Sequence, residues 1–136
     1  MNPLTSYLAT LVPLAVLDAL WLLVIAKGFY AERMGFLFQK TINLAPVALF
    51  YPLYALAVYG LVVAPAVVSG SWSEALWRGA LLGLAAYGAY DLTNHATIAN
   101  WPLVITVVDI LWGMAVTALT SVAAFWAIMA LKKTWM

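Results

Sequence analysis

The sequence predicts an all-α polytopic membrane protein, a four-transmembrane-helix antiparallel bundle. Hydrophobic residues make up 67% of the chain, charged residues make up only 8%, and the mean hydropathy is +1.02. A water-soluble protein needs a polar surface that this composition does not supply, so we expect a lipid bilayer around the chain. The few charged residues also divide the sequence into long apolar stretches.

A transmembrane helix requires about 20 predominantly apolar residues. Four stretches meet this requirement, at residues 4–26, 42–68, 75–97 and 103–131. The charged segment KGFYAERMGFLFQKT separates the first two stretches, and the turn SGSWSE separates the second from the third. Pro102 follows the third stretch, and its missing N–H favours a new helix start there.

Short connections between four helices predict an up-down-up-down arrangement in a single transmembrane domain, residues 1–136. Both termini and the turn SGSWSE would then lie on one side of the membrane, opposite the first loop and the Pro102 break. Three basic residues fall on each side: Arg78, Lys132 and Lys133 on the first, and Lys27, Arg33 and Lys40 on the second. The positive-inside rule therefore leaves the orientation open.

Composition also excludes several classes of function. The chain contains no cysteine, which rules out disulfides and thiolate metal sites, and its net charge of +1 gives no basic surface for nucleic acid. The lipid bilayer is the partner that the composition predicts. Gly79 and Gly83 form a G-x-x-x-G pair, which permits close helix approach within the chain or a homodimer.

Three carboxylates lie inside the predicted spans at nearly the same depth. Asp18 lies about eight residues before the first loop, roughly 12 Å along a helix, and Asp91 and Asp109 lie about six residues from their helix ends, roughly 9 Å. An ionisable residue within a span costs about 2.5–3.5 kcal/mol on insertion scales and usually faces the bundle interior. We therefore predict an acidic chamber that opens toward the first loop.

Helical spacing adds polar residues to this chamber. Tyr87, Asp91, Asn94 and His95 follow an i, i+4, i+7, i+8 pattern and share one helix face. The predicted binding or proton-relay residues are Asp18, Asp91, Asn94, His95 and Asp109, with Tyr51, Tyr54 and Asn43 lining the chamber and Arg33 over its mouth. A weak internal repeat, D-x-L-W, occurs in LDALW around Asp18 and in VDILW around Asp109.

Metal binding is a second use of the same groups. Asp91 and His95 are four residues apart on a helix, and with Asp109 they offer ligands suited to a hard ion such as Mg²⁺ or Mn²⁺. The sequence has no second histidine. A hydrogen-bonded histidine is therefore the preferred interpretation, and the sequence indicates no particular cofactor.

The runs LDALW, KGFYAERMG, YDLTNHATIANWP and VDILWG resemble the signature segments of a family of small bacterial integral membrane proteins catalogued as a domain of unknown function. The resemblance covers nearly the whole chain. It implies a multi-pass protein of the bacterial inner membrane with the same four spans. The family has no established activity, so the resemblance assigns no catalytic or binding residue.

Three hypotheses for the function remain. The first is a protein that binds or transports a small cationic or polar ligand, or protons, in the acidic chamber. The second is a membrane enzyme that acts on a lipid or isoprenoid with Asp and His as acid and base, although no catalytic motif indicates a reaction class. The third is a structural or assembly subunit whose aspartates only join helices.

Overall fold

The computed structural model describes residues 2–134, and every regular secondary-structure element in that range is a helix. In chain order the α-helices are α1 (Pro3–Leu20), α2 (Lys27–Met34), α3 (Leu44–Val58), α4 (Ala64–Ser69), α5 (Trp72–Thr97) and α6 (Leu103–Thr134). A π-helical turn, Trp21–Ile25, continues α1, and a second one, Tyr59–Val63, joins α3 to α4 into one continuous helix. The all-α fold class is confirmed.

Three helical segments are long and apolar enough to cross a membrane among the described residues: Pro3–Ile25, Leu44–Ser69 and Leu103–Thr134. They agree with the predicted spans 4–26, 42–68 and 103–131. Helix α5 covers the remaining predicted span, residues 75–97, but it is less hydrophobic and is not one of these three membrane-spanning candidates.

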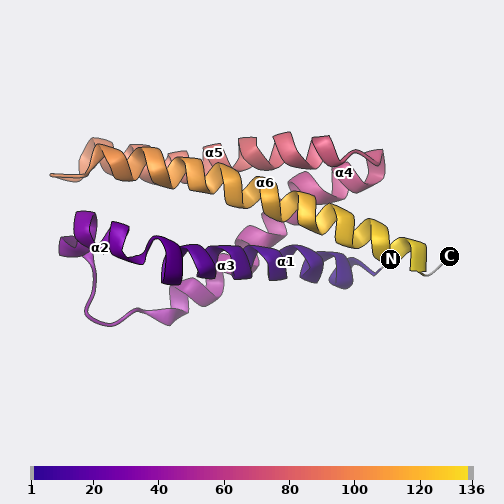
Figure 1. Ribbon diagram of the computed structural model, residues 1–136, viewed down its shortest axis with the longest axis horizontal. Coiled ribbons are helices and arrows are strands. Elements are labelled where there is room, and N and C mark those ends of the chain that lie inside the picture. The colour runs from indigo at the N-terminus through magenta and orange to yellow at the C-terminus, as the bar shows by residue number, and fades with distance from the viewer. Residues whose placement is uncertain (1, 135–136) are drawn as a thin grey trace.

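The long helices run in alternating directions, as Figure 1 shows. The start of α1, the end of α6 and the α4–α5 turn lie at one end of the molecule, while α2 and the connection before α6 lie at the other. Helix α3 packs against α1, and its continuation through the π-helical turn and α4 packs against α5 and α6. The first half of this long helix therefore packs mainly against α1, and its second half packs against α5 and α6.

Small residues bring α5 and α6 into close antiparallel contact. A Cβ atom added at Gly83 would lie 2.2 Å from the carbonyl oxygen of Gly113, and one added at Gly79 would lie 2.8 Å from the Cα of Ala118. Real side chains do not approach this closely, so only glycine fits at these positions. The G-x-x-x-G pair is thus used within the chain, between α5 and α6.

Helix α2 is the main departure from the sequence prediction. Residues 27–41 were expected to form a charged loop, yet Lys27–Met34 is helical and is followed by a 3-10 turn at Gly35–Leu37. The helix forms because Tyr30 and Met34, one turn apart, pack beside Trp101, just before α6, and Ile105 in its first turn. This packing places a tyrosine hydroxyl close to the predicted acidic layer.

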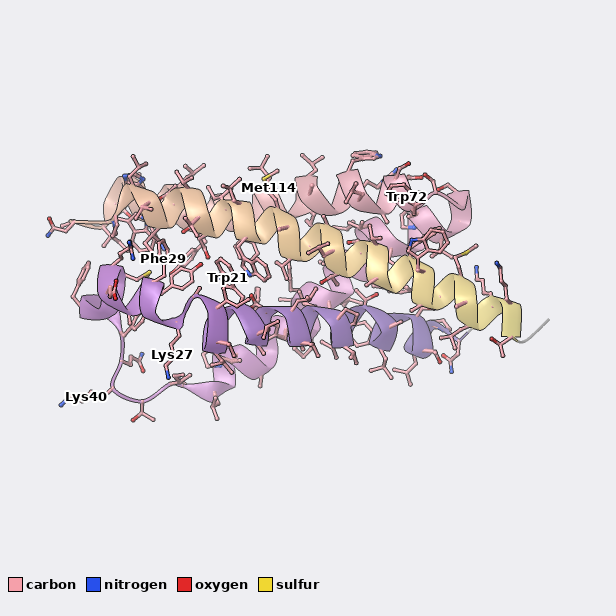
Figure 2. All side chains as sticks on the ribbon, in the orientation of Figure 1. Trp21, Lys27, Phe29, Lys40, Trp72 and Met114 are labelled. Atoms are coloured by element: carbon pink, nitrogen blue, oxygen red, sulfur yellow. The ribbon has the colours of Figure 1, made fainter. Side chains whose placement is uncertain are left out.

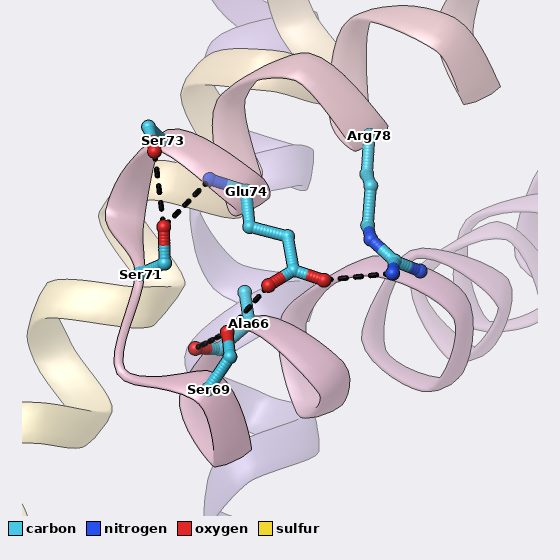
Figure 3. A network of polar contacts seen from close by, with 6 residues as sticks. All are labelled: Ala66, Ser69, Ser71, Ser73, Glu74 and Arg78. Atoms are coloured by element: carbon cyan, nitrogen blue, oxygen red, sulfur yellow. Dashed lines mark hydrogen bonds and ion pairs between the residues drawn. The ribbon is translucent and has the colours of Figure 1, made fainter.

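The turn between α4 and α5 is fixed by local polar contacts, drawn in Figure 3. Gly70 ends α4 with φ at 68°, a left-handed conformation that glycine adopts without strain. Ser71 caps α5 by accepting a hydrogen bond of 3.2 Å from the backbone N–H of Glu74. The Glu74 carboxylate in turn pairs with Arg78 at 2.7 Å and accepts a hydrogen bond from Ser69.

Replacing Gly83 with alanine should destabilise the α5–α6 contact. The added methyl group meets backbone atoms of α6, which cannot move aside cheaply, so we expect a loss of about 1–3 kcal/mol in the free energy of unfolding. Thermal unfolding in detergent, followed by circular dichroism, measures the effect. Gly60→Ala is the matched control because no atom lies within 4 Å of a Cβ added there. Equal melting midpoints for the two variants would contradict the packing argument.

Candidate functional site

Asp18 is a buried carboxylate with two hydrogen-bond donors from two other helices. Its side chain comes from the last turn of α1, and the residue is only 5% exposed. Trp112 of α6 donates its indole N–H to Oδ1 at 2.9 Å, and Tyr51 of α3 donates its hydroxyl to Oδ2. Because both oxygens accept a hydrogen bond, Asp18 can lie in the interior as a carboxylate and join α1, α3 and α6.

Asp109 receives its donor from the helix that the sequence prediction missed. The hydroxyl of Tyr30 on α2 donates to Oδ1 at 2.7 Å, and the same hydroxyl accepts from the indole N–H of Trp21 at 3.2 Å. Burial, together with the nearby Asp109 carboxylate, raises the pKa of Tyr30 far above its usual value, so the hydroxyl keeps its proton and remains the donor.

The D-x-L-W repeat forms a reciprocal contact between α1 and α6. The rings of Trp21 and Trp112 stack with their centroids 4.4 Å apart and their planes at 9°. Figure 2 shows Trp21 pointing from the end of α1 toward α6. Each tryptophan serves the aspartate of the opposite helix: Trp112 reaches Asp18 directly, and Trp21 reaches Asp109 through Tyr30. We name these six residues the D-W clamp: Asp18, Trp21, Tyr30, Tyr51, Asp109 and Trp112.

Asp91 has no such support. The residue is completely buried on α5, and neither carboxylate oxygen has a hydrogen-bond partner within residues 2–134. The antiparallel register of α5 and α6 places it opposite Asp109, because His95 contacts Thr106 one turn to one side and Tyr87 contacts Gly113 one turn to the other. The two carboxyl groups therefore face each other across the α5–α6 contact.

Two cavities adjoin the D-W clamp. The first has a volume of about 370 Å³ and is lined by Asp18, Leu22, Phe50, Tyr51, Ala86, Tyr87, Tyr90, Asp109 and Trp112. The second, of about 520 Å³, lies between α2 and α6 and is mostly apolar, with Lys27, Tyr30, Tyr90 and Asp109 as its polar groups. Leu22, Tyr90 and Asp109 line both cavities, so Asp109 lies where the two meet.

His95 and Tyr54 belong to separate polar contacts. The Nδ1 atom of His95 lies 3.1 Å from the hydroxyl of Thr106, which also accepts the indole N–H of Trp101 at 3.0 Å. The hydroxyl of Tyr54 lies 2.7 Å from that of Thr117 in the core. Neither side chain lines the first cavity.

The remaining predicted residues lie outside both cavities. Asn43 caps α3 by accepting a hydrogen bond of 3.2 Å from the backbone N–H of Ala45. Arg33 lies over the ring of Phe29, with its guanidinium carbon 4.1 Å from the ring centroid. Asn94 is partly buried on α5 and lines neither cavity.

The structure gives no metal-ligand cluster for the described residues. Within residues 2–134, no group of three or more His, Cys, Asp or Glu side chains is arranged to hold a metal ion. Asp91 and Asp109 face each other, but the Nδ1 atom of His95 is engaged by Thr106.

Sequence reasoning left three members of the D-W clamp out of the site: Trp21, Tyr30 and Trp112. The D-x-L-W repeat could have predicted the two tryptophans. Residues three apart on a helix share a face, and each tryptophan lies three residues after its aspartate. Tyr30 had no comparable signal, because its segment was expected to be a loop.

Replacing Tyr51 with phenylalanine should destabilise the protein by about 1–2 kcal/mol, because a buried carboxylate loses one of its two donors. The melting midpoint in detergent measures the loss. Tyr59→Phe is the matched control, because Tyr59 is not among the tyrosines whose hydroxyl makes a hydrogen bond within residues 2–134. Those tyrosines are Tyr7, Tyr30, Tyr51 and Tyr54. If Tyr51→Phe and Tyr59→Phe had the same melting midpoint, the hydrogen bond from Tyr51 to Asp18 would not stabilise the fold.

The sequence matches one known protein family over most of its length. Residues 3–126 match the family described as "Predicted membrane protein (DUF2177)". No curated protein and no solved structure matches the chain. The match includes every residue of the D-W clamp as well as Asp91. The chain therefore belongs to this family of predicted multi-pass membrane proteins.

Proposed function

We propose that this protein binds a small organic cation in the first cavity and carries it across the bacterial inner membrane. The proposal takes the chain as one transmembrane domain of four spans, in which α5 is added to the three long apolar helical segments described above. The observation that carries it is the presence of two carboxylates, Asp18 and Asp109, in the wall of a cavity whose other polar groups come from aromatic side chains.

The length and surface of α5 support its assignment as a span. Its 26 residues give a length of about 39 Å, more than the roughly 30 Å of a hydrocarbon core. Its charged residues Glu74 and Arg78 lie in the first two turns and pair with each other, while Asp91 is turned inward. The exposed side chains along the rest of the helix are mostly apolar: Leu76, Trp77, Leu81, Leu84, Tyr90 and Leu92.

The chemistry of the first cavity favours a cation over a neutral or anionic ligand. Lysine and arginine are absent from its lining, so no basic group neutralises the two carboxylates there. Tyr51, Tyr87 and Trp112 present aromatic rings to the same space, and such rings attract organic cations through their negative faces. A volume of about 370 Å³ suits a small amine or quaternary ammonium ion rather than a metal ion.

The position of Asp109 supports movement of the ligand as well as binding. It lines the inner cavity and also the apolar cavity under α2, so a cation could pass from one to the other while staying beside one carboxylate. Toward the α2 end we keep Arg33 as the predicted mouth residue and Asn43 as a predicted lining residue. Asn94 and His95 stay predicted binding or proton-relay residues. Two copies of so short a chain would supply the repeat symmetry usual in transporters.

Replacing Asp109 with asparagine should weaken cation binding at least tenfold, because an interior cation loses one of its two counter-charges. The probe is benzyltrimethylammonium, titrated into protein in lipid nanodiscs by calorimetry with empty discs subtracted. Its uncharged isostere, neopentylbenzene, should fail to compete.

Glu32→Gln is the matched control for this charge change. Its carboxylate lies on α2, and the side chain is 77% exposed and lines neither cavity. Equal affinities for Asp109→Asn and Glu32→Gln, or equal binding of the neutral isostere, would contradict the proposal.

A further inference from the structure

The contact between Asp91 and Asp109 poses a problem that the cavity alone does not explain. Asp91 is fully buried, both of its oxygens lack a donor, and the group that it faces is another carboxyl. An ionised carboxylate is only an acceptor, so two ionised groups cannot form a hydrogen bond to each other. They would also repel each other strongly in the low dielectric of a membrane interior.

A single proton removes both difficulties. If one carboxyl is protonated, its O–H donates to the other, one buried oxygen of Asp91 gains a partner, and the pair carries one negative charge instead of two. Asp18 needs no such proton because Tyr51 and Trp112 already donate to its two oxygens. Asp109 has only the Tyr30 donor, and Asp91 has none.

Among the described residues, no neighbouring side chain supplies the positive charge that would replace this proton. The titratable side chains facing the pair or its cavities are Lys27 and Tyr30 from α2, Asp18 from α1, and Tyr87, Tyr90 and His95 from α5. From α3, Tyr51 is engaged with Asp18. Lys27 is exposed, and in the part of the chain that the structure describes no ion pair joins it to either carboxyl.

We infer that Asp91 and Asp109 share one proton and that a cation entering the first cavity displaces it, so that the cavity exchanges a proton for an organic cation. This inference rests on the proposed function. The exchange balances: the protonated pair has a charge of −1, and after loss of H⁺ to solvent the doubly ionised pair plus a monovalent cation again totals −1. The low-dielectric interior therefore keeps the same charge in both states.

The direct test of the shared proton needs no ligand. Infrared difference spectra of the protein in nanodiscs, recorded between acidic and alkaline pH, should show the carbonyl stretch of a protonated carboxylic acid at neutral pH. The band should be absent from Asp91→Asn and from Asp109→Asn, and present in Glu32→Gln. Its absence from the unmodified protein would overturn the inference whether or not any cation binds.

The test of exchange measures proton release with benzyltrimethylammonium as the probe. In weakly buffered solution, the unmodified protein should release about one proton for each cation bound, and the affinity should rise about tenfold per pH unit while the pair remains protonated. Asp91→Asn should bind the cation with no proton release and with a pH-independent affinity. Glu32→Gln should behave like the unmodified protein.

The outcomes separate the two proposals. Cation binding without proton release and without pH dependence in the unmodified protein would overturn the exchange but leave the proposed function standing. No cation binding at all would overturn the proposed function and the exchange with it, while the infrared band would still decide whether the pair holds a proton. Proton release that persists in Asp91→Asn would assign the proton to another group and overturn the inference.

Discussion

The requirement that every buried carboxylate find a donor or a proton organises the interior of this bundle. In water a carboxylate is solvated from all sides. In a membrane interior, a buried polar group without a hydrogen bond costs about 2–7 kcal/mol. The three interior aspartates meet this requirement to different degrees. Asp18 has two donors, Asp109 has one and Asp91 has none. This gradation separates a structural carboxylate from one that is free to react.

The donors also determine how the helices are joined. Each one reaches an aspartate on a different helix, so the hydrogen bonds that satisfy the charges also hold α1, α2, α3 and α6 together near one end of the molecule. Helix α5 is held in another way, by glycine contacts against α6. It also contacts α6 through His95 and Thr106. Helix α5 contributes Asp91 to the acidic layer, whereas the donors to Asp18 and Asp109 come from α2, α3 and α6.

The sequence predicted much of the fold because hydropathy and helix-breaking residues set the helix ends. The first predicted stretch, 4–26, corresponds to the helical segment Pro3–Ile25, and the fourth, 103–131, lies within Leu103–Thr134. Counting 1.5 Å per residue from those ends was enough to place the three aspartates near one depth. Helix α2 could not be found in this way, since only tertiary packing of Tyr30 and Met34 on α6 makes that polar segment helical.

The partners of each aspartate were also beyond the sequence. Which tryptophan meets which aspartate depends on how α1 and α6 are rotated about their axes. The π-helical turn at Trp21–Ile25 is wider than an α-helical turn and so changes the direction of the side chains that it carries, and no residue pattern marks it. The Asp91–Asp109 contact depends on the register of α5 against α6, which is set by backbone approach at Gly83 and Gly113. Helical periodicity gives the face of a residue but not the neighbour it meets.

The stacked pair of Trp21 and Trp112 has an optical consequence. Two indole rings 4.4 Å apart and nearly parallel have transition dipoles close enough to couple, so their ultraviolet absorption is shared between them and differs from that of an isolated tryptophan. An exciton couplet in the circular dichroism spectrum would follow the geometry of the clamp itself. Any movement of α1 relative to α6 would thus be visible without an attached dye.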